Sequence, residues 1–386
     1  MLHYTNQELE QLGAAITTRE IYQQPSVWQE SFQSYKEKKT NIEAFLQELR
    51  DQEVHKVIFT GAGTSAYVGD SLSPILNTLY DQNDFHFESV ATTDLVSNPR
   101  AYLQEDIPTL LVSFARSGNS PESVAAVNLA KQLVNKLYQM TITCAADGQL
   151  AQQAHGDAKN LLLLQPDRSN DAGFAMTSSF SSMLLTGLLV FDPADLSQKE
   201  EKFETLLRLT QAIFDAVPQI KANVDRDFKR VIYLGAGPFF GLGHETQLKI
   251  LELTAGQVAT MYETPVGFRH GPKSFVDGET IVLIFGSVDP YTRLYDRDLV
   301  AELASDGIAQ EVIYFTNQAS GIENIQEVFV DTDDSFGDAY RVFPYLVYGQ
   351  LFALLTSLKV GNLPDTPSPT GTVNRVVQGV LIHDLI

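Results

Sequence analysis

The stretch VIFTGAGTSAYVGD at residues 57–70 decides the fold, because a second version of it occurs later in the chain. Residues 231–244 read VIYLGAGPFFGLGH, and at an offset of 174 residues the two segments share six identities in fourteen positions. In both, a short apolar run enters a glycine loop that opens a helical pattern, which is typical of a buried strand followed by a helix.

Two further pairs of apolar runs follow in the same order. TLLVSF at 109–114 matches TIVLIF at 280–285, and residues 140–145 match residues 312–317 more weakly. Short apolar strands that alternate with helical patterns indicate βαβ units and a parallel sheet. We therefore predict two copies of one α/β domain, at residues 51–200 and 201–362. A helical arm at 1–50, with a break at Gln24-Pro25-Ser26, precedes them, and a tail at 363–386 follows.

Composition narrows the class of partner. The 386 residues are enough for two domains, and 27 Lys+Arg against 48 Asp+Glu leave a net charge of −21. Such a charge repels nucleic acid and anionic membrane surfaces, so neither is expected as a partner. Cys144 is the only cysteine, which excludes an internal disulfide and a cysteine metal cluster. With no signal-peptide pattern and no apolar run of membrane length, we expect a cytoplasmic protein.

The loop after the run at 109–114 offers the sharpest sign of a binding site. It reads Arg116-Ser117-Gly118-Asn119-Ser120-Pro121, with Ser120 in a good N-cap position and Pro121 suited to a first helical turn. Hydroxyls and backbone amides at a helix N-terminus form an anion site, and a phosphate is the typical occupant. The alternative is that Ser120 only caps the helix and Ser117 only turns the chain.

The glycine loop at Gly61-Ala62-Gly63-Thr64-Ser65 lies on an adjacent predicted strand, so both loops are expected at the same sheet edge. Its spacing, Gly61-x-Gly63-x-x-Ala66, also fits a dinucleotide-binding fingerprint, and a tight turn without a ligand is a third reading. The loops of the second copy lack these hydroxyls, so phosphate binding is expected only in the first.

The second copy carries a different set of candidates. Glu245, Lys249 and Glu252 fall on one face of a predicted helix at 242–256, as either a solvated, salt-bridged face or an active-site base beside a lysine. His270, in Arg269-His270-Gly271-Pro272, could be a proton shuttle or an ordinary surface histidine. His244-Glu245 begins like a zinc-protease motif, but Leu248 replaces the second histidine, so no metal is expected. Neither a serine-hydrolase elbow nor a P-loop occurs.

From residue 19 to the C-terminus, the sequence resembles the sugar isomerase (SIS) domain proteins with two SIS copies. The resemblance rests on residues 19–25, 61–65, 116–120, 245–252 and 270–272, and the nearest subgroup is the bacterial tagatose-6-phosphate ketose/aldose isomerases, also described as galactosamine-6-phosphate deaminase/isomerases. It implies two flavodoxin-like domains, a sugar-phosphate substrate and no cofactor. It further implies aldose–ketose isomerisation with deaminase (C–N hydrolase) activity in amino-sugar catabolism. A sugar-phosphate sensor without catalysis, or an enzyme for another hexose or hexosamine 6-phosphate, are the alternatives.

The resemblance also assigns roles to residues. It implies phosphate and substrate binding by Thr64, Ser65, Arg116, Ser117, Gly118, Asn119, Ser120, Thr177 and Ser178. Glu252 corresponds to the base that moves a proton between C1 and C2, and Lys249 to a lysine that positions hydroxyls or tunes Glu252. His270 corresponds to the ring-opening residue, which often reaches the site from a neighbouring subunit, so a homodimer or higher homo-oligomer is expected.

Two departures from the family pattern stand out. The family's phosphate loop usually begins Ser-Gln-Ser-Gly, whereas this chain has Ala115-Arg116-Ser117-Gly118, which makes the Arg116 guanidinium a candidate phosphate donor. The tail, where the related synthase has a lysine that reaches the sugar, reads Asn374-Arg375-Val376-Val377. Amine chemistry by a tail lysine is therefore not expected.

Overall fold

The computed structural model describes residues 2, 4–81, 84–377 and 379–385. Residues 1, 3, 378 and 386, at the ends of the predicted arm and tail, lie outside that description. The chain forms two compact units, A and B. Unit A comprises Gln23–Ala172, Met176–Pro193 and Thr370–Ile386; unit B comprises Met1–Tyr22, Gly173–Ala175 and Ala194–Pro369.

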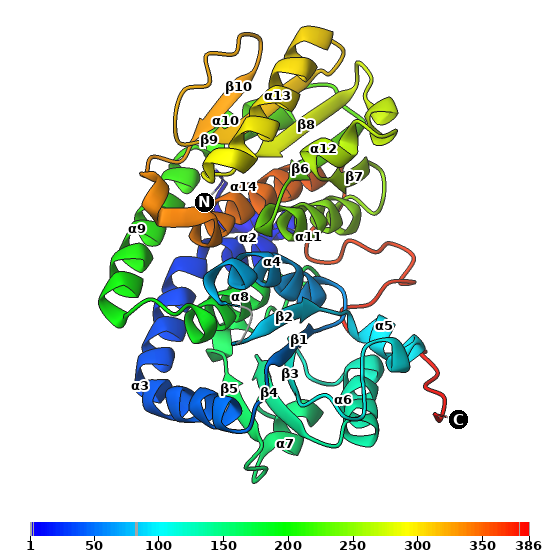
Figure 1. The fold of residues 1–386 in the computed structure, drawn as a ribbon. Helices are drawn as coiled ribbons and strands as arrows, with labels where there is room; N and C mark the ends of the chain where they lie inside the picture. The colour runs from blue at the N-terminus through cyan, green and yellow to red at the C-terminus, as the bar shows by residue number, and fades with distance from the viewer. Residues whose placement is uncertain (1, 3, 82–83, 378, 386) are drawn as a thin grey trace. The chain divides into compact units, whose positions relative to one another are not determined.

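Unit A is built on a parallel sheet, sheet A, with strand order β2-β1-β3-β4-β5 (Figure 1). Its strands are β1 (Lys56–Thr60), β2 (His86–Ser89), β3 (Thr109–Ala115), β4 (Leu137–Thr143) and β5 (Asn160–Leu164). Its helices are α3 (Gln24–Asp51), α4 (Thr64–Leu79), α5 (Thr92–Ser97), η1 (Pro99–Ala101), α6 (Pro121–Leu133), α7 (Gln149–Ala154), η2 (Asp167–Ser169) and α8 (Ser178–Phe191). Every residue of β3 and β4 is buried, as expected of strands covered on both faces.

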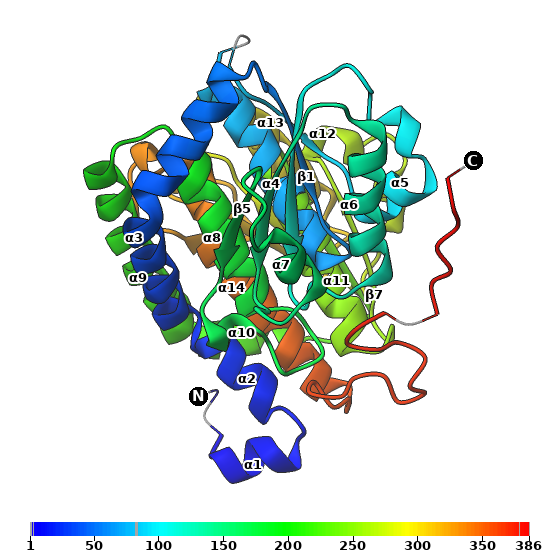
Figure 2. The same ribbon diagram turned by 90° about the horizontal axis from the view of Figure 1, so that it is seen from below.

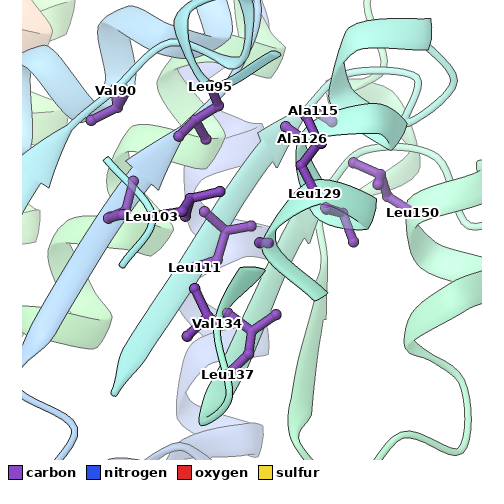
Figure 3. Packing of buried hydrophobic residues seen from close by; sticks show 13 residues of the cluster. Val90, Leu95, Leu103, Leu111, Ala115, Ala126, Leu129, Val134, Leu137 and Leu150 are labelled. Carbon is purple, nitrogen blue, oxygen red and sulfur yellow. The ribbon is translucent and has the colours of Figure 1, made fainter. Parts of the chain in front are cut away.

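Helices cover both faces of sheet A. α4 and α8 pack on one face, with α3 lying along α8 (Figure 2), and α5, α6 and α7 pack on the other. Figure 3 shows the apolar layer under α5 and α6, where Leu111 of β3 meets Leu95, Ala126 and Leu129 of the helices. Burial of such aliphatic side chains is the main source of stability for the layer.

Unit B repeats the plan on sheet B, with order β10-β9-β8-β6-β7. Its strands are β6 (Arg230–Gly235), β7 (Ala259–Glu263), β8 (Thr280–Phe285), β9 (Glu311–Thr316) and β10 (Gln326–Phe329). Its helices are α1 (Asn6–Gln11), α2 (Ala15–Tyr22), α9 (Leu196–Asp215), α10 (Val217–Val224), α11 (Pro238–Leu253), α12 (Pro265–Phe268), η3 (Pro272–Phe275), α13 (Pro290–Asp306), η4 (Asp334–Phe336) and α14 (Gly337–Lys359). α11 and α14 pack together on one side, and α12 and α13 enclose a second apolar cluster on the other.

The two sheets confirm the predicted duplication. Counted from the first strand of each copy, both have the flavodoxin-type order 2-1-3-4-5. The three pairs of matched sequence segments fall on β1 and β6, β3 and β8, and β4 and β9, which occupy the same places in their sheets. The prediction of two tandem flavodoxin-like domains is therefore correct.

The segments outside the sheets divide differently from the predicted arm. α1 and α2 belong to unit B, where Tyr22 stacks on Phe214 at 4.5 Å, whereas α3 belongs to unit A, where the Trp28 indole donates to Ser181 Oγ at 2.8 Å. The predicted boundary between residues 200 and 201 falls inside α9. None of the helices in the described part of the chain combines the length and hydropathy that a bilayer span requires.

Candidate active site

In unit A, the turn from β1 into α4 is built so that only glycine fits at Gly61. A Cβ there would lie 2.5 Å from the carbonyl carbon and oxygen of Ser65, too close for any side chain. Gly63 follows with φ +55° as the N-cap of α4. The turn thus places Thr64 and Ser65, both buried, in the first turn of the helix, where backbone amides and the helix dipole favour an anion.

The second loop of unit A joins β3 to α6 and keeps its hydroxyls available. Ser120 occupies the N-cap position, but its side chain accepts no capping hydrogen bond, so the reading in which it only caps the helix is wrong. Ser117 Oγ accepts from the Asn119 N–H at 3.3 Å, which forms a local turn. As an acceptor in this bond, the Ser117 hydroxyl keeps its own proton for donation to a ligand. No hydrogen bond joins the backbone N–H of Ser117, Gly118 or Ser120 to another described residue.

The two loops share one edge of sheet A. β1 and β3 are hydrogen-bonded neighbours in parallel register, with Thr60 opposite Ser113, so the loops that follow them leave the same ends of adjacent strands. A second support comes from α7, where Asn119 Oδ1 accepts from the Gln149 N–H at 3.0 Å and Gly118 O from the Leu150 N–H at 3.2 Å. Asn119 therefore holds the loop onto α7. Its role as a direct phosphate ligand stays a prediction.

Arg116 and Arg375 join the phosphate loop to the C-terminal tail. Arg116 is only 7% exposed, and its guanidinium donates to the main-chain oxygen of Arg375 at 2.5 Å. Arg375 Nε donates to Asp171 O at 2.9 Å, and its Nη2 to Asn170 Oδ1 at 3.1 Å. The tail segment that lacks the lysine of the related synthase thus places Arg375 beside Asp171 and Arg116. Arg116 remains a predicted phosphate donor, with the tail as its observed partner.

The positive charge of the two arginines also reaches Cys144. Burial raises the pKa of the Cys144 thiol to about 12, and Arg116 and Arg375 oppose that rise. The only thiol of the chain is thus protonated at neutral pH and is no nucleophile. The two guanidinium groups give this region the local positive charge that a phosphate needs in a chain of net charge −21.

Asp171 organises the segment that precedes α8. This fully buried carboxylate accepts the N–H groups of Thr177, Ser178 and Ser179 at 2.8–3.0 Å and the hydroxyls of Thr177 and Ser179 at 3.0 and 2.6 Å. Ser178 Oγ accepts from Gln23 Nε2 at 3.0 Å. Thr177 and Ser178 stay predictions as substrate contacts. Sequence reasoning missed Asp171, although an acid shortly before Thr-Ser-Ser at a helix start is a capping signal.

In unit B, the predicted trio lies on α11. This helix begins at Pro238, four residues earlier than expected, because proline suits the first helical turn after Gly237. Lys249 Nζ lies 2.7 Å from Glu252 Oε2 and 3.4 Å from Glu245 Oε1. The side chains of Glu245 and Lys249 have no exposed surface, and that of Glu252 is 21% exposed. A solvated helix face is thereby excluded.

The charge balance of the trio fixes the protonation of its lysine. Burial alone would lower the pKa of Lys249, but the carboxylates of Glu245 and Glu252 outweigh it and raise the pKa. Lys249 is thus a permanent cation between two acids. Of the three side chains, only that of Glu252 reaches the surface, which makes it the candidate base of the trio.

His270 lies in the loop between α12 and η3 of the same unit. Its ring is exposed, and no hydrogen bond joins its side chain to another described residue. The flanking residues are held to α13, since Arg269 Nε donates to Glu302 Oε2 at 2.7 Å and Lys273 forms ion pairs with Glu302 and Asp306. No hydrogen bond or ion pair joins His270 to Glu252 among the described residues.

The loop of unit B that corresponds to the phosphate loop is filled by the protein's own carboxylates. The N–H of Ser287 donates to Asp296 Oδ2 at 2.8 Å and that of Val288 to Asp338 Oδ1 at 2.9 Å, while Ser287 Oγ donates to Asp338 Oδ2 at 2.5 Å. Two buried acids, from α13 and α14, thus occupy amides that could otherwise bind an anion. These two N–H groups are therefore already bonded within the protein, in line with the expectation that phosphate binding is confined to the first copy.

This arrangement predicts a pH-dependent penalty. Burial raises the pKa of Asp296 to about 7, helped by the charge of Asp338, and Oδ1 of Asp296 has no hydrogen-bond partner among the described residues. A raised carboxyl pKa contributes stability below the unfolded pKa, and this is lost as the pH rises through about 7. We expect Asp296→Asn to raise the free energy of unfolding by about 1–3 kcal/mol at pH 8 and by much less at pH 5.

Urea unfolding of wild type and Asp296→Asn at both pH values measures this difference. Asp298→Asn, an exposed acid on the same helix, is the matched control. An Asp296→Asn gain that is equal at pH 5 and pH 8 would contradict the assignment of the titration to Asp296.

No group of three or more His, Cys, Asp or Glu side chains suited to a metal ion is found among residues 2, 4–81, 84–377 and 379–385. The structure thus offers two sets of groups: donors at the loop edge of sheet A, and, in unit B, a largely buried Glu–Lys–Glu trio together with the separate His270 loop.

Two flavodoxin-type sheets, one followed by hydroxyl-bearing loops and one packed beside the helix of the acid–lysine trio, define a double-SIS protein, and a SIS domain family model matches residues 49–192. The D-galactosamine-6-phosphate deaminase AgaS of Escherichia coli is 45% identical over 95% of both chains. The AgaS of Shewanella sp. strain ANA-3 is 41% identical over 98% of this chain and 95% of its own. This chain belongs to the AgaS family of SIS proteins.

A solved structure supports the same grouping. The crystal structure of tagatose-6-phosphate ketose/aldose isomerase from Escherichia coli superimposes with a TM-score of 0.87 at 42% identity, covering 95% of this chain and 96% of that one. The resemblance read from the sequence is therefore confirmed at the level of family and fold.

Proposed function

We propose that this chain is a galactosamine-6-phosphate deaminase/isomerase that yields tagatose 6-phosphate and ammonia. The observation that carries the proposal is the trio on α11, in which a fully buried Lys249 holds a partly exposed Glu252 carboxylate at 2.7 Å. Support for the substrate comes from relatives at 41–45% identity over nearly the whole chain whose names specify D-galactosamine 6-phosphate.

The phosphate end of the substrate is assigned to unit A. Thr64, Ser65, Ser117, Ser120 and the amides of the β3–α6 loop are the groups that would hold it, because they combine hydroxyls, N–H donors and two helix N-termini. This region anchors the sugar and takes no part in bond making.

The reacting end is assigned to Glu252 and His270. His270 assists opening of the sugar ring. Glu252 takes the proton from C2, the electron pair of the C2–H bond forms the C1–C2 double bond of an enolamine, and the C1=O π pair moves to O1, which takes a proton from solvent. The protonated Glu252 then returns a proton to C1 while the nitrogen lone pair forms a protonated C2 imine, which adds water and releases ammonia to leave the ketose phosphate. With a hydroxyl at C2 in place of the amine, the same transfers at C2 and C1, with O1 gaining a proton and O2 losing one, complete an aldose–ketose isomerisation.

A pure sugar-phosphate sensor is the alternative function class. A sensor needs the anchoring loops of unit A, but it has no use for an acid held by a buried lysine. Burying an ion pair costs free energy that an apolar pair of the same size would not cost. A chain that keeps such a pair beside a partly exposed acid therefore favours an enzyme. A dinucleotide enzyme fits less well, since the classic strand order of that fold is 3-2-1-4-5-6 and sheet A has 2-1-3-4-5.

The test is incubation of the purified protein with galactosamine 6-phosphate, glucosamine 6-phosphate and tagatose 6-phosphate, with ammonia and ketose measured together. We expect equal amounts of ammonia and tagatose 6-phosphate from galactosamine 6-phosphate. Ketose without ammonia would indicate an isomerase alone, and binding without any product would establish a sensor.

The anchoring role predicts a split between binding and turnover. Removing the two hydroxyls in Ser117→Ala/Ser120→Ala takes away donors that bind ground state and transition state alike, so KM should rise about 10–100-fold while kcat changes little. Steady-state kinetics measures the split, with Ser97→Ala, an exposed serine of the same unit, as the control. A fall in kcat at unchanged KM would contradict a purely anchoring role.

The expectation of a shared histidine is tested by mixing subunits. If His270 of one subunit serves the site of its neighbour, inactive His270→Asn and Glu252→Gln proteins should regain activity when they are unfolded and refolded together. Equal mixing should then restore a fraction of wild-type activity. No recovery would mean that His270 and Glu252 of the same subunit act together.

A further inference from the structure

We propose that Glu302 is a positioning residue that fixes the His270 loop on α13. This rests on the proposed role of His270 in ring opening. His270 lies between two very short elements, α12 and η3, and is followed by Gly271 with φ +122°. The His270 N–H donates to Gly267 O at 2.9 Å within the loop, so a fixed position on the rest of the unit has to come from contacts outside it.

Glu302 ties the loop on both sides of the histidine. Its Oε2 accepts from Arg269 Nε at 2.7 Å, and its Oε1 accepts from Lys273 Nζ. Lys273 also pairs with Asp306, one turn further along α13, at 2.5 Å. Each carboxylate oxygen of Glu302 therefore holds one flank, so a single side chain spans the histidine.

A buried phenylalanine also holds the loop. Phe268, two residues before His270, is fully buried and packs in the apolar cluster that contains Leu299 and Leu303 of α13. The Lys273 and Arg269 hydrogen bonds lower the pKa of Glu302, so its charge is retained at neutral and mildly acidic pH. Phe268 thus anchors the loop in the apolar cluster, and Glu302 binds the residues on either side of His270.

The ion pairs of Glu302 are too exposed to contribute much to the stability of the fold. Arg269, Lys273 and Glu302 are each about one-third exposed, at 29%, 28% and 35%. Pairs of this exposure contribute about 0–1 kcal/mol to folding. What they provide instead is a fixed geometry, and a displacement of about 1 Å at a reacting group can cost roughly 100-fold in rate.

A double-mutant cycle tests the inference by measuring kcat and KM for wild type, Glu302→Gln, His270→Asn and the double variant. We expect Glu302→Gln to lower kcat about tenfold at nearly unchanged KM and melting temperature, and to have no further effect in the His270→Asn background. Glu302→Asp, which keeps the charge, should recover part of the loss. Glu279→Gln, which removes the exposed partner of Lys229 in the same unit, should leave kcat unchanged.

The outcomes separate this inference from the proposed function. If His270→Asn is slow and the two losses multiply in the double variant, Glu302 does not act through His270 and the inference is wrong. If His270→Asn keeps the full kcat, the assigned role of His270 fails and the inference fails with it. Should Glu302→Gln not fold, Lys273→Gln removes the same bond from the loop side and takes its place in the cycle.

Discussion

Replacing Glu252 by Gln is expected to lower kcat by about 10²–10⁴-fold while leaving the dissociation constant of the sugar phosphate nearly unchanged. The amide keeps the size of the side chain and an oxygen that can accept from Lys249 Nζ, 2.7 Å away in wild type, but it cannot take a proton from C2. Lys249 keeps Glu245 as a charged partner, so the buried cation remains paired and the fold should be retained.

Turnover assays and calorimetric titration with the sugar phosphate measure the two quantities separately. Glu204→Gln, an exposed glutamate of α9 in the same unit, is the matched control and should behave as wild type. Glu252→Gln protein with full activity would remove Glu252 from the mechanism, and a variant that no longer binds the sugar phosphate would show that it acts in binding.

The second large effect is expected on stability. Asp171→Ala should lower the free energy of unfolding by about 3–5 kcal/mol, because it leaves the N–H groups of Thr177, Ser178 and Ser179 buried without an acceptor. Asp171→Asn should lose less, since one amide oxygen still accepts. Denaturant unfolding measures both.

Asp167→Ala is the control, an exposed acid four residues earlier in the same segment. If Asp171→Ala unfolds like wild type, Asp171 does not hold the start of α8. Arg375 donates to the main-chain oxygen of Asp171, which the substitution keeps, but loss of the side-chain bonds should loosen the segment that carries this oxygen. The variant should therefore also free the C-terminal tail for proteolysis at lower protease concentrations than wild type.

The architecture was accessible from the sequence because it depends on local patterns. Buried parallel strands are continuous apolar runs, and the glycine turns that follow them occur in both copies of the chain for steric reasons. A Cβ at Gly61 would lie 2.5 Å from the backbone of Ser65, and one at Gly235 would lie 2.5 Å from the Phe239 side chain. Helix periodicity likewise placed Glu245, Lys249 and Glu252 on one face. The complete burial of Lys249 depends on tertiary packing, which residue spacing along a helix does not predict.

The features that were missed join residues far apart in the chain. Asp338 reaches the loop at Ser287 across 51 positions, and Arg375 reaches Asp171 across 204. The arm was predicted as one segment with a break at Gln24-Pro25-Ser26. In the structure a single residue separates α2 from α3, yet the two helices belong to different units. Helix patterns predict which face is apolar, but they do not say which surface will cover it.

The most direct test of proton transfer by Glu252 is the position of solvent deuterium in the ketose product. Galactosamine 6-phosphate is converted in D₂O, and the tagatose 6-phosphate is analysed by NMR. The Glu252 side chain is 21% exposed, so the acid formed during turnover should exchange with solvent before it returns its proton. We expect one deuterium at C1, on a single face. Product without deuterium at C1, as a direct hydride shift from C2 would give, would contradict it.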